Sequence, residues 1–68
     1  KPVDDRDVAA RALGALTPRQ RAALVLTEAL GYSGEETGRL LGIKASTVWA
    51  LTHQARAALR QTVEATDA

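Results

Sequence analysis

The chain has 68 residues, no Cys, one His and a net charge of +1 at pH 7. A domain of this size buries only about 60% of the surface that its unfolded chain exposes, and without Cys neither a disulfide nor a thiolate metal site can reinforce its core. A lone His builds no metal site, and no apolar run approaches the roughly 20 residues of a membrane span, so we expect a cytoplasmic domain with neither cofactor nor membrane segment.

The composition predicts a single all-α domain over residues 1–68. Ala and Leu dominate every segment, and none alternates with period two, which predicts four helices without a β wing. The chain contains no Met, so we expect it to be one domain, the C-terminal one, of a longer protein.

The first helix is predicted to end near Leu13, with Gly14 as its stop. It begins at aspartates whose charge suits its positive end, Asp4, Asp5 and Asp7.

The second helix begins at a capping box. Thr17 can cap it, Pro18 suits the first helical position, and Gln20 stands three residues after the cap. We expect it to run to about Leu30 and end at Gly31. The residues expected to point inward are Ala22, Ala23, Leu24, Leu26 and Leu30.

A second capping box, Ser33 with Glu36, opens a short helix from about Gly34 to Leu41 that Gly42 ends. Its apolar contacts are expected from Leu40, Leu41 and Ile43.

The fourth and longest helix is predicted from about Ala45 to Val63 and has two faces. At 100° per residue, its core residues fall within about 60° of one line. These are Val48, Leu51, Ala55, Leu59 and Val63. A second stripe beside them is left to be presented to a partner: Trp49, His53, Arg56 and Arg60.

A short capped helix, a turn with Gly and a longer amphipathic helix together predict a helix-turn-helix. The second helix of that motif enters the DNA major groove with its N-terminal part. The residues expected to enter are Ser46, Thr47, Trp49, Ala50, His53 and Gln54. Ser33 and Gly34 are candidates for backbone contact, because helix N-termini offer N–H groups to phosphates.

Charge supports a polyanionic partner. Residues 39–60 contain four basic residues and no acid, namely Arg39, Lys44, Arg56 and Arg60. We assign Lys44, Arg56 and Arg60 to phosphate contact, and the alternatives are a solvated face or an ion pair with Glu64. Cations are unfavourable at a helix start, so Arg19 and Arg21 are expected to bind a partner or phosphate.

Several side chains allow more than one role. Trp49 can contact a sugar or thymine methyl, bind a partner protein, or cover the flank of its own domain. His53 and Gln54 are either base contacts or plain surface residues. We expect no catalytic residue, because His53 has no nucleophile or carboxylate spaced to work with it.

Four blocks of the sequence carry a resemblance to a known family. They are L-T-P-R-Q-R-A-A-L-V-L (Leu16–Leu26), G-Y-S-G-E-E (Gly31–Glu36), R-L-L-G-I-K-A-S-T-V (Arg39–Val48) and A-R-A-A-L-R (Ala55–Arg60). Over Ala9–Arg60 they resemble region 4 of bacterial sigma factors, most closely the extracytoplasmic-function type. LuxR-type output domains also begin L-T-P-R, but their spacing is one residue shorter than the fifteen positions from Leu16 to Gly31.

The resemblance implies a domain that binds the promoter −35 element and docks on the β flap of RNA polymerase, with an anti-sigma factor as a further partner and no enzymatic activity. Two alternatives stay open. One is a protein-interaction module on the same fold, which the loss of the family's basic residues at 49, 51 and 54 favours. The other is the output domain of another transcription regulator.

Three further positions depart from the family pattern. Gly38 replaces Ala in the supporting helix, where Gly costs about 1 kcal/mol. Its two interpretations are that it permits close helix packing or that it simply weakens this short helix. Lys44 replaces the Ser that precedes the recognition helix, so we expect Ser46 to cap it. Thr52 replaces a core Leu, and Leu51 is expected to take over part of that packing.

Overall fold

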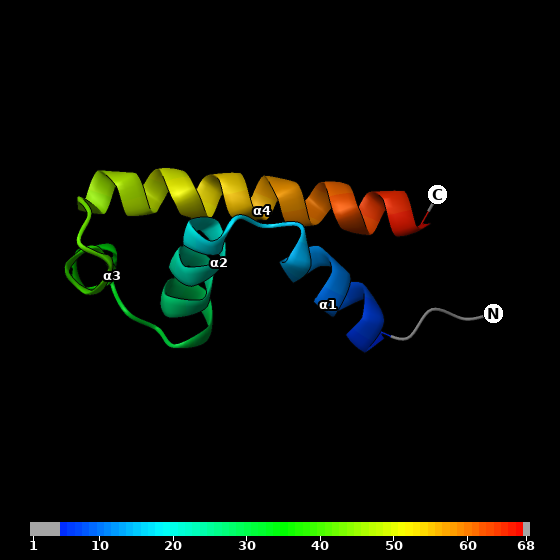
Figure 1. Cartoon of the computed structure of the whole chain (residues 1–68), viewed down its shortest axis with the longest axis horizontal. Coiled ribbons are helices and arrows are strands. Elements are labelled where there is room, and N and C mark those ends of the chain that lie inside the picture. The colour runs from blue at the N-terminus through cyan, green and yellow to red at the C-terminus, as the bar shows by residue number, and fades with distance from the viewer. Residues whose placement is uncertain (1–4, 68) are drawn as a thin grey trace.

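The computed structural model describes residues 5–67, and all of its regular structure there is helical (Figure 1). Its elements are α1 (Asp5–Gly14), α2 (Pro18–Leu24), the π-helical segment η1 (Val25–Ala29), α3 (Gly34–Leu41) and α4 (Ala45–Asp67). The predicted all-α fold is confirmed, while Asp4 lies outside the described residues. No described helix is both long and apolar enough to cross a bilayer.

Helix α4 is the common support of the domain. In Figure 1 it extends along one side, and α3, α2 and α1 lie in a row against it. Because a helix rises about 1.5 Å per residue, its 23 residues give the domain an elongated shape of 43 × 18 × 15 Å.

Both predicted capping boxes form. Thr17 Oγ1 accepts from the Gln20 N–H at 3.2 Å, and Gln20 Oε1 accepts from the Thr17 N–H at 3.0 Å. Ser33 and Glu36 make the same exchange at 3.0 and 2.9 Å. Helix α3 therefore has the predicted bounds, and Gly42 ends it in the left-handed conformation at φ 71°.

The second helix reaches its predicted length by changing type. After Leu24 the turn widens, and the Leu30 N–H donates to the Val25 carbonyl at 3.0 Å. Thr27 Oγ1 donates to the Ala23 carbonyl at 2.8 Å, and a side chain that enters the backbone ladder in this way favours such a widening. Gly31 follows at φ 77°.

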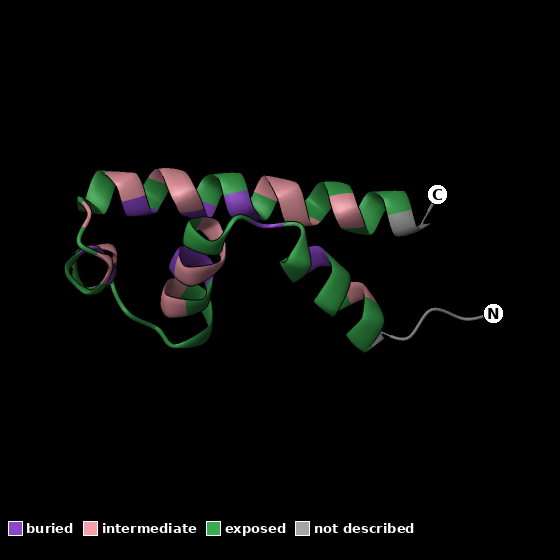
Figure 2. Cartoon of the chain, viewed as in Figure 1, coloured by how far each residue is buried: buried purple, intermediate pink, exposed green. Residues whose placement is uncertain are grey.

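The buried hydrophobic core consists of Ala, Leu and Val residues, and Figure 2 shows buried positions on the side of α4 that faces the other helices. Leu16, Leu24 and Ala55 form its central cluster, and Leu59 packs against them half-buried. Near the N-terminal end of α4, Val48 is also buried, with 1% of its surface exposed. Such a core agrees with the marginal burial expected at this chain length.

Three residues predicted to be inward are exposed instead: Leu30 at 62%, Leu40 at 60% and Val63 at 40%. Leu30 lies at the end of the widened π turn, so it leaves the face that α2 buries. In α3 the buried residues are Thr37 and Gly38, and the helical period turns Leu40 away from them. Val63 lies on the last turns of α4, past the central cluster.

Candidate nucleic-acid interface

The turn between α3 and α4 is held tightly against α3. The Ile43 N–H donates to the Gly38 carbonyl at 2.9 Å. A Cβ on Gly38 would lie 2.6 Å from the Ile43 carbonyl oxygen, which is backbone and has little room to move. Gly38 therefore permits the close packing, and it fixes how α4 leaves the turn.

Lys44 occupies the cap position of α4. Its carbonyl accepts from the Thr47 and Val48 N–H groups at 3.0 and 3.1 Å, and the helix begins at Ala45. The expectation that Ser46 caps the helix is therefore wrong, because Ser46 already lies inside the first turn. Its exposed side chain stays available to a partner.

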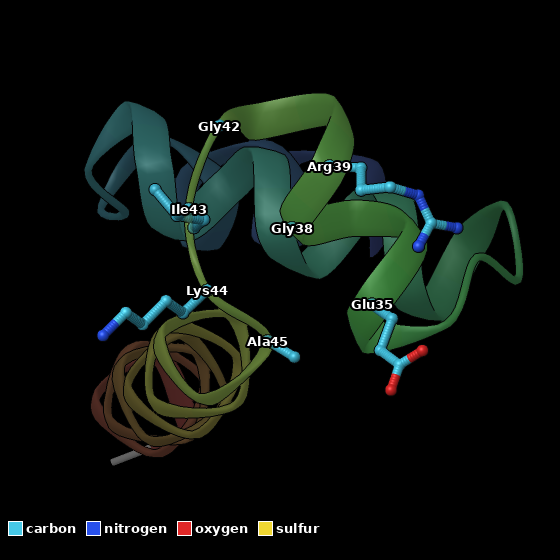
Figure 3. Close-up of a pocket in the computed structure, with 7 residues that line it drawn as sticks. All are labelled: Glu35, Gly38, Arg39, Gly42, Ile43, Lys44 and Ala45. Atoms are coloured by element: carbon cyan, nitrogen blue, oxygen red, sulfur yellow. The ribbon is translucent and has the colours of Figure 1, made fainter.

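Two cations flank the turn. Figure 3 shows the Lys44 side chain projecting to one side of the turn. The Arg39 and Glu35 side chains project from α3 on the other side. Between them lies an open hollow of about 500 Å³, lined by Glu35, Gly38, Arg39, Gly42, Ile43, Lys44 and Ala45. A strand of phosphates that passes the turn would meet positive charge on either side of this hollow.

The second stripe of α4 is presented to solvent, as the periodicity predicts. Trp49 is 65% exposed, and His53, Arg56 and Arg60 are exposed as well. The Trp49 and His53 rings lie 4.0 Å apart between centroids, tilted by 42°. Trp49 thus leaves most of its surface open to solvent or to a partner, while the rest of it borders a hollow that it shares with Glu28 and Gly34.

The remaining groove candidates surround this ring pair. Ser46 and Gln54 are exposed, while Thr47 and Ala50 are half-buried. Gln54 Oε1 accepts from Gln20 Nε2 at 3.4 Å, which ties the far end of the surface to α2. We call the surface formed by Ser46, Thr47, Trp49, Ala50, His53 and Gln54 the leading face of α4.

The core side of α4 explains how these residues are held outward. Thr52 is 7% exposed and occupies the position of the family's Leu, and its Oγ1 donates to the Trp49 carbonyl at 2.8 Å. Leu51 is half-buried, as expected of a residue that shares this packing.

Arg21 has a structural role that the sequence did not indicate. Its Nε donates to the Leu13 carbonyl and a terminal nitrogen donates to the Leu16 carbonyl, both at 3.0 Å. These carbonyls lie at and just after the end of α1, where backbone acceptors lack helical partners. Arg19 is exposed.

The structure pairs Arg56 with an acid from another element. Its guanidinium forms an ion pair with the Glu28 carboxylate of η1. Sequence reasoning missed this pair, because it joins residues of different helices and no local spacing marks it. The four cations of residues 39–60 are thus partly neutralised from outside their own segment.

The start of α3 lies beside α4. Gly34 and Trp49 line the same hollow of about 280 Å³. Bonding to the Ser33 backbone and hydroxyl holds the pKa of Glu36 below its ordinary value. The first N–H groups of a helix lack helical partners, so Gly34 places a backbone donor next to the leading face, whereas the Ser33 N–H already donates to the Glu36 carboxylate.

Comparison with protein families agrees with this arrangement. The family model for Sigma-70, region 4, matches residues 6–59. The chain belongs to the sigma-70 region 4 family. Region 4 is a helix-turn-helix domain, and its family is not a class of enzymes.

Curated relatives carry the same family name. An RNA polymerase sigma-E factor of Streptomyces antibioticus and one of Streptomyces avermitilis are each 40% identical over 93% of this chain and 35% of their own length. An ECF RNA polymerase sigma factor, SigE, of Mycolicibacterium smegmatis is 47% identical over 72% of this chain and 19% of its own length. The region 4 domain is thus of the extracytoplasmic-function type, and it spans about a third or less of these relatives. No solved structure matches the chain.

Proposed function

We propose that this domain recognises the promoter −35 element for a sigma factor of the extracytoplasmic-function type. The observation that carries the proposal is the exposed leading face of α4, positioned by a tight helix-turn-helix turn. Family membership over residues 6–59 supplies the sigma context. The relatives are RNA polymerase sigma factors, so we extend the proposal to a longer sigma factor that works with RNA polymerase in the cytoplasm.

Within this proposal, the base contacts come from Trp49, His53 and Gln54. A helix in the major groove contacts base edges with its N-terminal residues, and these three are exposed there. Ser46, Thr47 and Ala50 complete the face that enters the groove.

The phosphate contacts come from both sides of the leading face. Lys44 lies at the start of α4 and Arg60 four turns later, with Arg56 between them. At the start of α3, Gly34 adds its backbone N–H and Ser33 its hydroxyl as donors to phosphate. Phosphate contacts set the register and supply most of the sequence-independent affinity.

Polymerase and an anti-sigma factor need surfaces of their own. An apolar patch is formed by Leu40 of α3 and by Tyr32 of the loop before it, 60% and 41% exposed. It borders a hollow of about 270 Å³ together with Glu36 and Arg39. Exposed apolar patches commonly mark protein interfaces. We assign this patch to the β flap, with Arg19 and Arg21 at the start of α2 as further partner residues, and we assign Trp49 to the anti-sigma factor when DNA is absent.

A protein-interaction module with little DNA affinity is the competing function. It is favoured by the uncharged leading half of α4 and by the exposed Trp49 ring. The two functions differ in how the binding affinity depends on salt. DNA binding weakens as salt rises, because neutralised phosphates release their counterions, and binding to a protein partner lacks this source of salt dependence.

Fluorescence anisotropy of a labelled duplex at low and at moderate salt tests the proposal. We expect weak binding that falls steeply with salt concentration. Arg60→Ala should weaken binding to all sequences alike, since a phosphate contact carries no sequence information. No binding even at low salt, or tight binding that salt does not weaken, would overturn the proposal.

A further inference from the structure

The ion pair between Glu28 and Arg56 lies on the same surface as the leading face of α4. Glu28, Trp49 and Arg56 line one hollow, which also includes the start of α3 at Gly34. The side chains of Glu28 and Arg56 are 48% and 51% exposed, so the pair is open to solvent and to a ligand. An acid thus stands where the proposed function requires phosphate contact.

The fold brings Glu28 to this place through η1. This π-helical segment carries Glu28 in its first turn. Beside it, the Thr27 hydroxyl donates a hydrogen bond to the Ala23 carbonyl of the preceding helical turn. π-Helical turns inside α-helices occur frequently at functional sites. Here the turn ends α2 with a carboxylate that reaches across to α4.

The chemistry of the pair sets up a competition. A guanidinium binds carboxylate and phosphate with the same donor geometry, so Glu28 and a DNA phosphate compete for Arg56. An exposed ion pair is weak, so phosphate can displace the carboxylate. The displaced carboxylate would then lie close to a polyanion that repels it.

We infer that Glu28 is a determinant of DNA affinity that acts through Arg56. It competes with the phosphate backbone for the guanidinium, so the phosphate contact of Arg56 is made only in part and contributes less affinity than the exposure of Arg56 would allow. This inference rests on the proposed function, because it needs DNA as the ligand. It requires no promoter selectivity, because phosphate contact is independent of sequence.

The test is a double-mutant cycle on a duplex of random sequence. We expect Glu28→Gln to raise affinity at low salt by about three-fold or more and to steepen the slope of log affinity against log salt by at most about 1. In an Arg56→Ala background, Glu28→Gln should change neither quantity beyond the general effect of removing one acid. Asp7→Asn, which removes an exposed acid from α1, away from the leading face, measures that general effect.

The outcomes separate this inference from its rivals. An equal gain with and without Arg56 would overturn it, because Glu28 would then act only through bulk charge. An unchanged or lower affinity of Glu28→Gln would overturn it too, because the pair would then position Arg56 for phosphate. Binding of all duplexes alike by the unmodified domain would refute promoter recognition but would still allow the cycle to be measured. An unmodified domain that binds no duplex at low salt would overturn both proposals, whereas loss of binding in Glu28→Gln alone would overturn only this inference.

Discussion

Trp49 gives the leading face of α4 its chemical character. The first turns of this helix carry Trp, Ala, Leu and Gln where the family has several cations, and Trp49 is 65% exposed beside His53. An apolar ring in the major groove gains most from the C5-methyl group of thymine, the only apolar group displayed there. The domain is therefore expected to depend on thymine methyls more than on bidentate hydrogen bonds.

This expectation is testable by removing single methyl groups. On a duplex selected from random sequence, replacing the contacted thymine with deoxyuridine should reduce the affinity of the unmodified protein by several-fold, which is roughly 1 kcal/mol of discrimination. Trp49→Ala should bind both duplexes equally well. If the deoxyuridine substitution still weakened the Trp49→Ala variant, another side chain would make the methyl contact.

Gly38 is the residue on which the geometry of the motif most depends. Ala has the better helix propensity by about 1 kcal/mol, but a Cβ at this position would lie 2.6 Å from the Ile43 carbonyl oxygen. Overpacking of this kind typically costs about 1–3 kcal/mol, so we expect Gly38→Ala to lower the free energy of unfolding. Urea denaturation measures this, with Gly34→Ala as the control, because its Cβ would meet nothing within 4 Å. An equal or higher stability of Gly38→Ala would show that the turn relaxes freely.

At the scale of the elements, the start of α3 is predicted to be sensitive to pH. The hydrogen bonds from Ser33 hold the pKa of Glu36 below its ordinary value, which is about 4.3 in an unfolded chain. The unfolded state therefore binds more protons as pH falls through this interval. The contribution of Glu36 to stability is present above the ordinary pKa and is lost toward the lowered one.

Glu36→Gln isolates this contribution. Its amide oxygen can still accept from the Ser33 N–H, but the side chain does not titrate. Thermal or urea unfolding over about pH 6 to 3 should show a larger loss of stability in the unmodified chain than in the variant. Parallel pH profiles would mean that the capping box does not discriminate between the two protonation states.

The attachment of α1 depends on Arg21, which donates to the Leu13 and Leu16 carbonyls. The bond to the Leu16 carbonyl is part-buried, and removing a donor from a buried acceptor costs about 1–3 kcal/mol. Arg21→Ala should therefore lower stability and raise amide hydrogen exchange in α1, whereas Arg19→Ala, at an exposed position, should do neither. Unchanged exchange in α1 would mean that packing on α4 alone holds this helix.

For the molecule as a whole, the sequence predicts those features that depend on residues close together in the chain. The starts of α2 and α3 are predictable because Thr17 and Ser33 each act on a residue three positions away. The face of α4 is predictable because one period places Val48 and Ala55 inward and Trp49 outward. The sigma family, too, is evident from motifs in the sequence.

The contacts between separate helices are not predictable in this way. The exposure of Leu30 and Leu40 depends on the π turn and on which side of α3 faces α4. The pair of Glu28 with Arg56 and the bonds of Arg21 to α1 link different elements. Local periodicity contains no information on these contacts, and they decide which cations remain available for DNA.

The central claim, that the leading face of α4 binds DNA, is tested most directly by NMR. A ¹⁵N-labelled domain is titrated with duplex DNA at low salt, and the amide shifts are mapped. The account predicts that the largest changes fall along the exposed stripe from Ser46 to Arg60 and at Ser33 and Gly34, with little change in α1. Changes centred on Tyr32 and Leu40 with an unperturbed α4, or no changes at all, would contradict it.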